Sequence, residues 1–217
     1  MARYLHGTST NGFDLTGMYY RGQWRATNDQ PLEAIQTGLI DRFGSLNPTD
    51  GGFSERYSLS GHYQRGDEHE KWQTSFYATH DRLTLWNDFT HYLVDPVDGD
   101  QFEQDETRTK VGGTLSYTRQ DTLFDHIPSQ TVFGIDGRYD TIFIDRRHTR
   151  QRVVLATCPD SPYGGGSYVC NADSVQEGRV AGYVQNTTRW LPWMRTVVGQ
   201  SLIHISEPTR LALMSYA

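Results

Sequence analysis

Apolar and polar residues alternate along several stretches of the chain with the two-residue period of a β-strand. The clearest stretches are 55–65, 106–119 and 131–143. In the last of them, Phe133 and Ile135 fall on one side, whereas Asp136 falls on the other. Because successive side chains of a strand point to opposite faces, each stretch predicts a strand with one apolar and one polar face. The charged residues that the pattern places on the polar face are Arg108, Lys110, Asp136, Arg138 and Asp140.

The connections between the predicted strands alternate between short and long. We expect short turns at 8–12, 66–70, 120–129 and 191–193, and long loops at 28–54, 88–105 and 148–178. This asymmetry is typical of an antiparallel transmembrane β-barrel, which has short periplasmic turns and long extracellular loops. A soluble β-sandwich is the alternative, but it gives no reason for a strict short-long order.

The amino-acid composition excludes several other classes of protein. Among the 217 residues are 13 tyrosines and 21 glycines, and helical periodicity is almost absent, so the chain is expected to be all-β. No run of about 18 apolar residues offers a membrane-spanning helix. A formal net charge of -6 provides no basic surface for nucleic acid.

Six aromatic residues lie beside the predicted short turns, where the interfacial girdle of a membrane barrel is found. They are Phe13, Tyr63, Trp72, Tyr117, Trp190 and Trp193. Aromatic residues flank turns in other β proteins too, so this placement supports the barrel without deciding it.

Three blocks of the sequence carry a family resemblance. They are AIQTGLIDRFGSLNPTDGGFSERYSLSGHY (34–63), LTLWNDFTHYLVDPVDGDQFEQDETRTKVGG (83–113) and GYVQNTTRWLPWMRTVVG (182–199). In their order and content they resemble the barrel of TonB-dependent outer-membrane receptors of Gram-negative bacteria. Barrels of that kind have about 22 strands and a plugged lumen. About eight strands are recognisable here, so we expect residues 1–200 to be a barrel fragment that forms an open, curved sheet.

The resemblance also implies a function and partners. It implies uptake of a scarce ligand, most often a ferric siderophore, across the outer membrane. Outer-membrane lipid is one expected partner, and the TonB energy-transducing complex is another. The complex would act through an N-terminal plug region that this sequence is expected to lack. A passive porin-like or adhesive barrel without a plug is the alternative.

The C-terminal residues depart from the strand pattern. The stretch SLIHISEPTR (201–210) matches the translation of a transposon-end adapter used in sequencing libraries. We therefore interpret residues 201–217 as a non-native tail, with the sheet ending near Gln200 and with Ile203 and Ile205 exposed.

Candidate chemistry is sparse. Cys158 and Cys170 flank a stretch rich in Gly, Pro and Ser in the third long loop, and this spacing in an exported chain predicts a disulfide. Asp95, Asp98 and Asp100 miss the EF-hand spacing and are better explained as a solvated turn. No nucleophile elbow, P-loop, dinucleotide motif or metal-ligand set is evident, so we expect no enzyme activity, cofactor or metal.

Two groups of residues near the long loops are candidates for facing a ligand. Trp86, Phe89 and Tyr92 would form an aromatic lip, or else belong to an outer interfacial girdle. The second group, Arg146, Arg147, Arg150 and Arg152, would form a basic rim for an anionic chelate. The alternative for the arginines is pairing with Asp140, Asp145 and acids of the loops. For Asp136, Arg138 and Asp140, a ladder of salt bridges in the lumen is expected rather than a ligand site.

Overall fold

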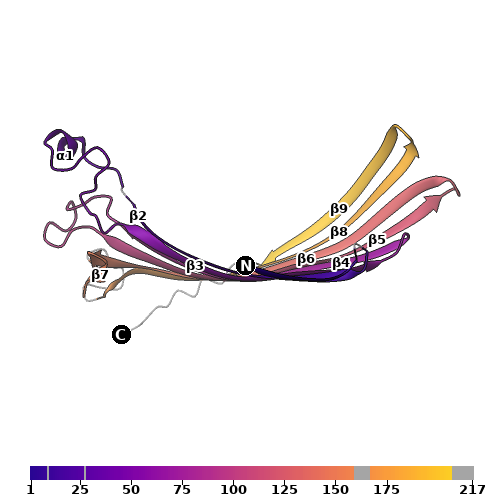
Figure 1. The fold of residues 1–217 in the computed structure, drawn as a ribbon, viewed down its shortest axis with the longest axis horizontal. Helices are drawn as coiled ribbons and strands as arrows, with labels where there is room; N and C mark the ends of the chain where they lie inside the picture. The colour runs from indigo at the N-terminus through magenta and orange to yellow at the C-terminus, as the bar shows by residue number, and fades with distance from the viewer. Residues whose placement is uncertain (9, 27, 159–166, 207–217) are drawn as a thin grey trace.

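The protein forms one curved β-sheet that is open at both sides (Figure 1). The structure is a computed structural model that describes residues 1–8, 10–26, 28–158 and 167–206. The long strands are β1 (Ala2–Gly7), β2 (Gly12–Arg25), β3 (Gly51–Gly66), β4 (Glu70–Asn87), β5 (Phe102–Leu123), β6 (Ile127–Arg150), β8 (Val169–Leu191) and β9 (Met194–Ser206). A two-residue strand, β7 (Val153–Val154), and one short helix, α1 (Leu32–Gln36), lie in the connections.

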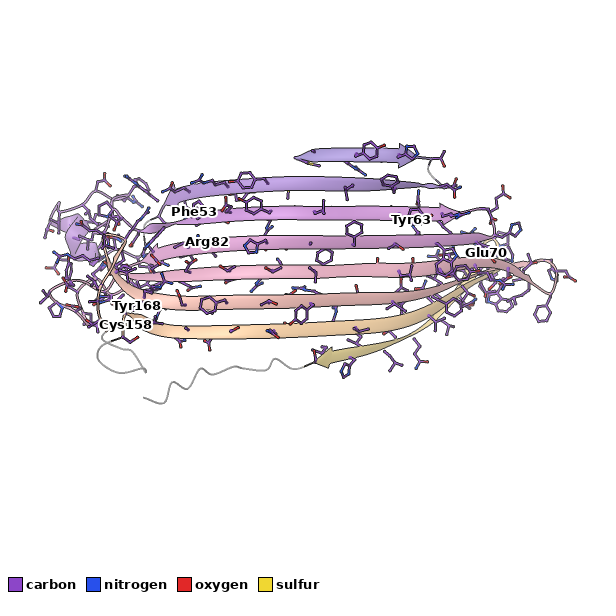
Figure 2. The ribbon with its side chains drawn as sticks, turned by 90° about the horizontal axis from the view of Figure 1, so that it is seen from below. Phe53, Tyr63, Glu70, Arg82, Cys158 and Tyr168 are labelled. Carbon is purple, nitrogen blue, oxygen red and sulfur yellow. A yellow bond between two sulfur atoms is a disulfide. The ribbon has the colours of Figure 1, made fainter. Side chains whose placement is uncertain are left out.

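The sheet is an antiparallel meander. Strands follow one another in the order β1-β2-β3-β4-β5-β6-β8-β9, and β7 pairs with the end of β6. Short turns join the strands at one end, and the long connections gather at the other, where Figure 2 labels Cys158 and Tyr168. We call these the short-turn end and the long-loop end. The predicted all-β class, the antiparallel order and the open, curved sheet are confirmed.

Among the described residues, no helix has the length and apolar character needed to cross a membrane.

The strands extend further toward the long loops than the sequence suggested. β6 has 24 residues and β8 has 23, so the third long loop covers 151–168 instead of the expected 148–178. Pairing continues through charged positions such as Asp145, opposite Ala172. Ladder hydrogen bonds join backbone groups, so they persist where the apolar alternation that predicts a strand has stopped.

The two faces of the sheet differ as the alternation predicted. The register aligns apolar side chains across every strand, for example Leu115 with Ile135 and Tyr117 with Phe133. This apolar face includes Phe13, Leu15, Tyr19, Tyr57, Leu59, Tyr63, Trp72, Phe76, Leu115, Tyr117, Phe133, Ile135, Tyr139, Val180 and Val184. The opposite, polar face includes Asp14, Arg56, Ser58, His62, Asp81, Arg108, Lys110, Thr114, Asp136, Arg138, Asp140 and Arg179.

No described part of the chain covers the apolar face as a second layer. Leu115 is 42% exposed and Ile135 57%, and the buried apolar residues in the described part of the chain are Ala34, Cys158 and Cys170. Toward the long-loop end the same face becomes charged, with Glu55 opposite Arg82. Soluble domains bury one face of a sheet against another element. A single sheet with an exposed apolar band therefore requires an apolar surrounding.

Several glycines lie beneath aromatic rings of neighbouring strands. A Cβ atom placed on Gly134 would lie 2.1 Å from Tyr183 Cζ, and one on Gly112 would lie 2.6 Å from the Tyr77 hydroxyl. On the apolar face, Phe76 covers Gly61 in the same way, at 2.4 Å. A ring lying over a glycine replaces the packing that the missing side chain would provide.

The C-terminal edge strand differs from the expectation. β9 continues past Gln200 to Ser206, where Ser206 pairs with Gly178, so the expected end of the sheet near Gln200 was wrong. Strand β8 offers unpaired backbone groups along its length, and any extended segment after the 191–194 turn can complete that ladder. Ile203 and Ile205 are exposed, at 60% and 57%, so backbone pairing holds this segment rather than side-chain burial. Residues 207–217 of the expected tail lie outside the described part of the chain.

Candidate functional site

The long-loop end of the sheet holds both groups of candidate ligand-facing residues, but on different sides. Arg146 and Arg147 are consecutive in β6 and therefore point to opposite faces. Arg146 lies on the side of the polar face, in register with Gln104, and Arg147 lies on the side of the apolar face, in register with Glu103.

On the apolar side, three of the candidates form one cluster around Glu103. The Arg147 guanidinium lies 3.3 Å from the Glu103 carboxylate and 2.5 Å from that of Asp145. The Trp86 indole N–H donates to Glu103 over 2.9 Å, and the Arg152 guanidinium stacks 4.5 Å from the centre of the Trp86 ring. These cations and this indole already have partners within the protein.

A junction of buried polar groups joins the three long connections beside this cluster. The Gln101 amide N–H₂ donates to Asp50 Oδ1 and Thr49 Oγ1, each over 2.9 Å. Its carbonyl oxygen accepts from the Thr149 hydroxyl at 3.2 Å and from the Arg152 backbone N–H at 2.9 Å. Gln101 and Asp50 are each only 1% exposed, and burial raises the pKa of the Asp50 carboxyl. This junction was not predicted from the sequence, since a single glutamine at the end of a loop has no distinctive pattern.

On the polar side, a cavity of about 210 Å³ lies between the second and third long connections. Its lining includes Phe89, Val94, Phe102, Arg146, His148 and the bridged Cys158 and Cys170. The Phe89 and Phe102 rings are 5.9 Å apart, and the Arg146 guanidinium lies 5.8 Å from the centre of the Phe102 ring. Phe102 and His148 were not among the predicted residues, although their pairing across β5 and β6 places both beside Arg146.

Two carboxylates shape the loop that closes this cavity. Asp100 accepts hydrogen bonds from the backbone N–H groups of Leu93 and Asp95, at 2.8 and 2.7 Å. Burial alone would raise the pKa of Asp100, but hydrogen bonds from Thr90 and these backbone groups outweigh it, and the pKa is lowered. Asp95 accepts from the N–H groups of Asp98 and Val97, which lower its pKa as well. Both side chains line the cavity and are ionised at neutral pH.

The remaining candidates lie at the exposed margin of this end. Arg150 pairs with Asp98 at 2.8 Å, and its side chain is 57% exposed. Tyr92 is 63% exposed. The structure thus divides the predicted aromatic and basic groups: Phe89 and Arg146 line the cavity, whereas Trp86, Arg147 and Arg152 belong to the Glu103 cluster.

The charged residues of the polar face are paired with one another. Arg138 binds Asp140 through two hydrogen bonds, at 2.9 and 2.5 Å, and Arg179 lies 2.6 Å from Asp136. Further pairs are Lys110 with Asp81 at 3.1 Å, Arg56 with Asp81, and Arg108 with Glu106 at 3.2 Å. The middle of the polar face is therefore a set of ion pairs.

A disulfide joins Cys158 and Cys170, and each cysteine is 4% exposed. Within the described residues, no group of three or more His, Cys, Asp or Glu side chains is placed to hold a metal ion.

The sheet, its single layer and its unequal ends define a segment of β-barrel wall. The crystal structure of the ferric citrate transporter FecA in its unliganded form has this fold: it matches 91% of the present chain with a TM-score of 0.71. The sequences are 14% identical, and the chain spans 27% of the length of that transporter chain. No protein-family model and no curated protein sequence matches the chain.

Proposed function

We propose that the chain forms part of the wall of a TonB-dependent receptor in the outer membrane of a Gram-negative bacterium. The observation that carries this proposal is the single-layer sheet with an exposed apolar band on one face and paired charges on the other. Lipid would cover the apolar face, and the polar face would line a lumen.

The position of the candidate site supports uptake rather than a purely structural role. The cavity lies on the polar side at the long-loop end, which in outer-membrane barrels faces the exterior. A ligand captured there would enter the lumen directly. A ferric siderophore or another small ligand is the expected cargo, and the TonB complex would supply the energy through a plug region of the kind found in these receptors.

The likeness to FecA supports this proposal at the level of architecture. FecA is a ferric citrate transporter. The ligand of the present chain is left open by that likeness.

A test of the proposal compares three strains of the source bacterium: wild type, a deletion of the gene that encodes this chain, and a deletion of the gene for TonB. We expect both deletions to abolish uptake of the same iron chelate from a panel of labelled chelates. Uptake lost in the first deletion but retained without TonB would favour a passive barrel. An encoded protein absent from purified outer membranes would contradict the proposal as a whole.

A further inference from the structure

Arg146 differs from Arg147 and Arg150 because its guanidinium has no ion pair among the described residues and contacts only an aromatic ring, that of Phe102. Its Nε atom is buried without a hydrogen-bond partner, and no described residue forms an ion pair with its guanidinium. Arg147, the next residue, has two carboxylates. A buried donor without a partner is unfavourable by about 1 to 3 kcal/mol. The Nε atom of Arg147 is also buried without a partner, but its guanidinium is paired with two carboxylates, so of these two residues Arg146 is the one whose charge is left for an external partner.

The surroundings of Arg146 define the shape of that partner. The Phe102 ring holds the guanidinium from one side, and the Phe89 ring continues the apolar wall. Val94 and the disulfide add further apolar surface to the cavity. A cavity of about 210 Å³ admits a small organic group, or one arm of a larger chelate. The partner therefore combines an apolar body with a group that accepts hydrogen bonds from a planar guanidinium.

The nearby acids limit the charge of that partner. Asp95 and Asp100 line the same cavity and are ionised at neutral pH, since backbone N–H groups stabilise their charged forms. Backbone N–H groups compensate the charges of these two carboxylates, so Arg146 is left to balance one negative charge of a ligand. A second negative charge would be repelled by Asp95 and Asp100. A carboxylate has the two coplanar oxygens that match the guanidinium fork.

We infer that this cavity binds a small aromatic monocarboxylate, or the monocarboxylate arm of a larger ligand. The carboxylate pairs with Arg146, and the ring lies against Phe89 and Phe102. This binding step goes beyond the proposed uptake function and does not depend on it, because the cavity would select its ligand in a passive barrel as well.

Binding can be measured by saturation-transfer NMR and calorimetry on the full chain folded in detergent micelles. The probes are benzoate, benzyl alcohol, acetate and phthalate at neutral pH. Benzoate is expected to bind saturably, and the other three to bind about tenfold more weakly or not at all. Benzyl alcohol lacks the charge, acetate lacks the ring, and phthalate carries a second charge.

Variants identify the residue responsible. Arg146→Gln is expected to weaken benzoate binding about tenfold or more, because it removes the charged fork. Arg150→Gln is the matched control: it removes an arginine of the same strand that is paired with Asp98 at the exposed margin, and benzoate binding should not change. Phe102→Leu keeps apolar volume but removes the ring, and it should weaken benzoate binding without affecting acetate. Circular dichroism checks that each variant folds.

The inference is overturned if benzyl alcohol or phthalate binds as well as benzoate, or if folded Arg146→Gln retains full benzoate affinity. If Arg146→Gln does not fold, the Phe102→Leu variant and the four probes decide the matter. Failure of benzoate binding leaves the proposed uptake function standing, and loss of TonB-dependent uptake in the strain test leaves this binding site standing.

Discussion

The side-chain amide of Gln101 donates a hydrogen bond of 2.9 Å to the carboxylate of Asp50, 51 residues earlier in the chain. This hydrogen bond connects the loop before β3 to the start of β5. The Gln101 side-chain oxygen accepts hydrogen bonds from Thr149 and Arg152, which connect the same point to the end of β6 and the loop that follows it. One glutamine thus joins three connections that are remote in sequence.

Replacing Gln101 with Ala should loosen all three connections together. The change removes a donor from the buried Asp50 carboxylate and the acceptor of the Arg152 backbone N–H, which should lower the local free energy of unfolding by about 2 to 3 kcal/mol. Hydrogen exchange measured by mass spectrometry should show faster exchange in 26–50, 88–101 and 151–155. Gln130→Ala, on an exposed position of β6, is the control and should have no effect there. Faster exchange confined to one connection would contradict the role of Gln101 as a junction.

Acid should destabilise the 88–101 loop at a pH at which the Gln101 junction is still stable. The lowered pKa of Asp100 means that its contribution to stability is complete above the unfolded value of about 3.9 and is lost as the pH falls through the lowered folded value. Asp50 has the opposite sign: its raised pKa favours the folded state at low pH, and this contribution is lost as the pH rises through the folded value.

The measurement is the protection of the Leu93, Val94 and Asp95 amides, corrected for intrinsic exchange, at about pH 5 and about pH 3. Protection should fall at the lower pH for these amides and hold for the Thr149 amide, which donates to the Gln101 carbonyl. Equal loss at both places would show that the carboxylate of Asp100 is not the cause.

The two faces of β5 should respond differently to a new charge. Arg in place of Leu115 should destabilise the membrane-embedded barrel by about 2 to 4 kcal/mol if this position is at the middle of the membrane. Arg in place of the adjacent Thr114 should cost much less, because Thr114 lies on the polar face opposite Asp136, which offers a carboxylate. Folding titrations into lipid vesicles measure the difference, and equal costs would favour a sheet with water on both faces.

Two glycines of β6 provide a test of ring-over-glycine packing. Gly134→Ala should destabilise the sheet by about 1 to 3 kcal/mol, because the new methyl group would collide with the Tyr183 ring. Gly137→Ala should be close to neutral, since its Cβ would approach nothing nearer than a backbone oxygen at 3.9 Å. Thermal unfolding in detergent compares them, and the packing interpretation fails if both variants melt alike.

Sequence periodicity predicted those features of the fold that can be recognised within a single strand or a single connection. The alternation around Ile135 and Leu115 identified the faces, and the alternation of short and long connections identified the two ends. The ends of β6 and β8 at the long loops were not predicted, because their backbone pairing continues through charged positions such as Asp145, where the apolar alternation has stopped. The continuation of β9 to Ser206 was not predicted because residues 201–206 were interpreted as part of a non-native tail, yet their backbone pairs with β8.

The site was predictable only by residue type. Aromatic and basic residues near the loops were recognisable, but the assignment of Arg146 to the cavity and Arg147 to the Glu103 cluster depends on strand register. Phe102 lines the cavity and Gln101 forms the junction through contacts with residues remote in sequence. The pattern of apolar and polar residues along the chain does not predict such contacts.

The disulfide has a consequence for the order in which the protein matures. Oxidation of cysteines in Gram-negative bacteria takes place in the periplasm, whereas the long-loop end of an outer-membrane barrel faces the exterior. If the chain is part of an outer-membrane barrel, as proposed, we expect Cys158 and Cys170 to be joined before the sheet enters the membrane. The disulfide in the wall of the cavity would then already be present in the precursor, before the chain inserts into the lipid bilayer. Alkylation of chains arrested before assembly should therefore detect no free thiols.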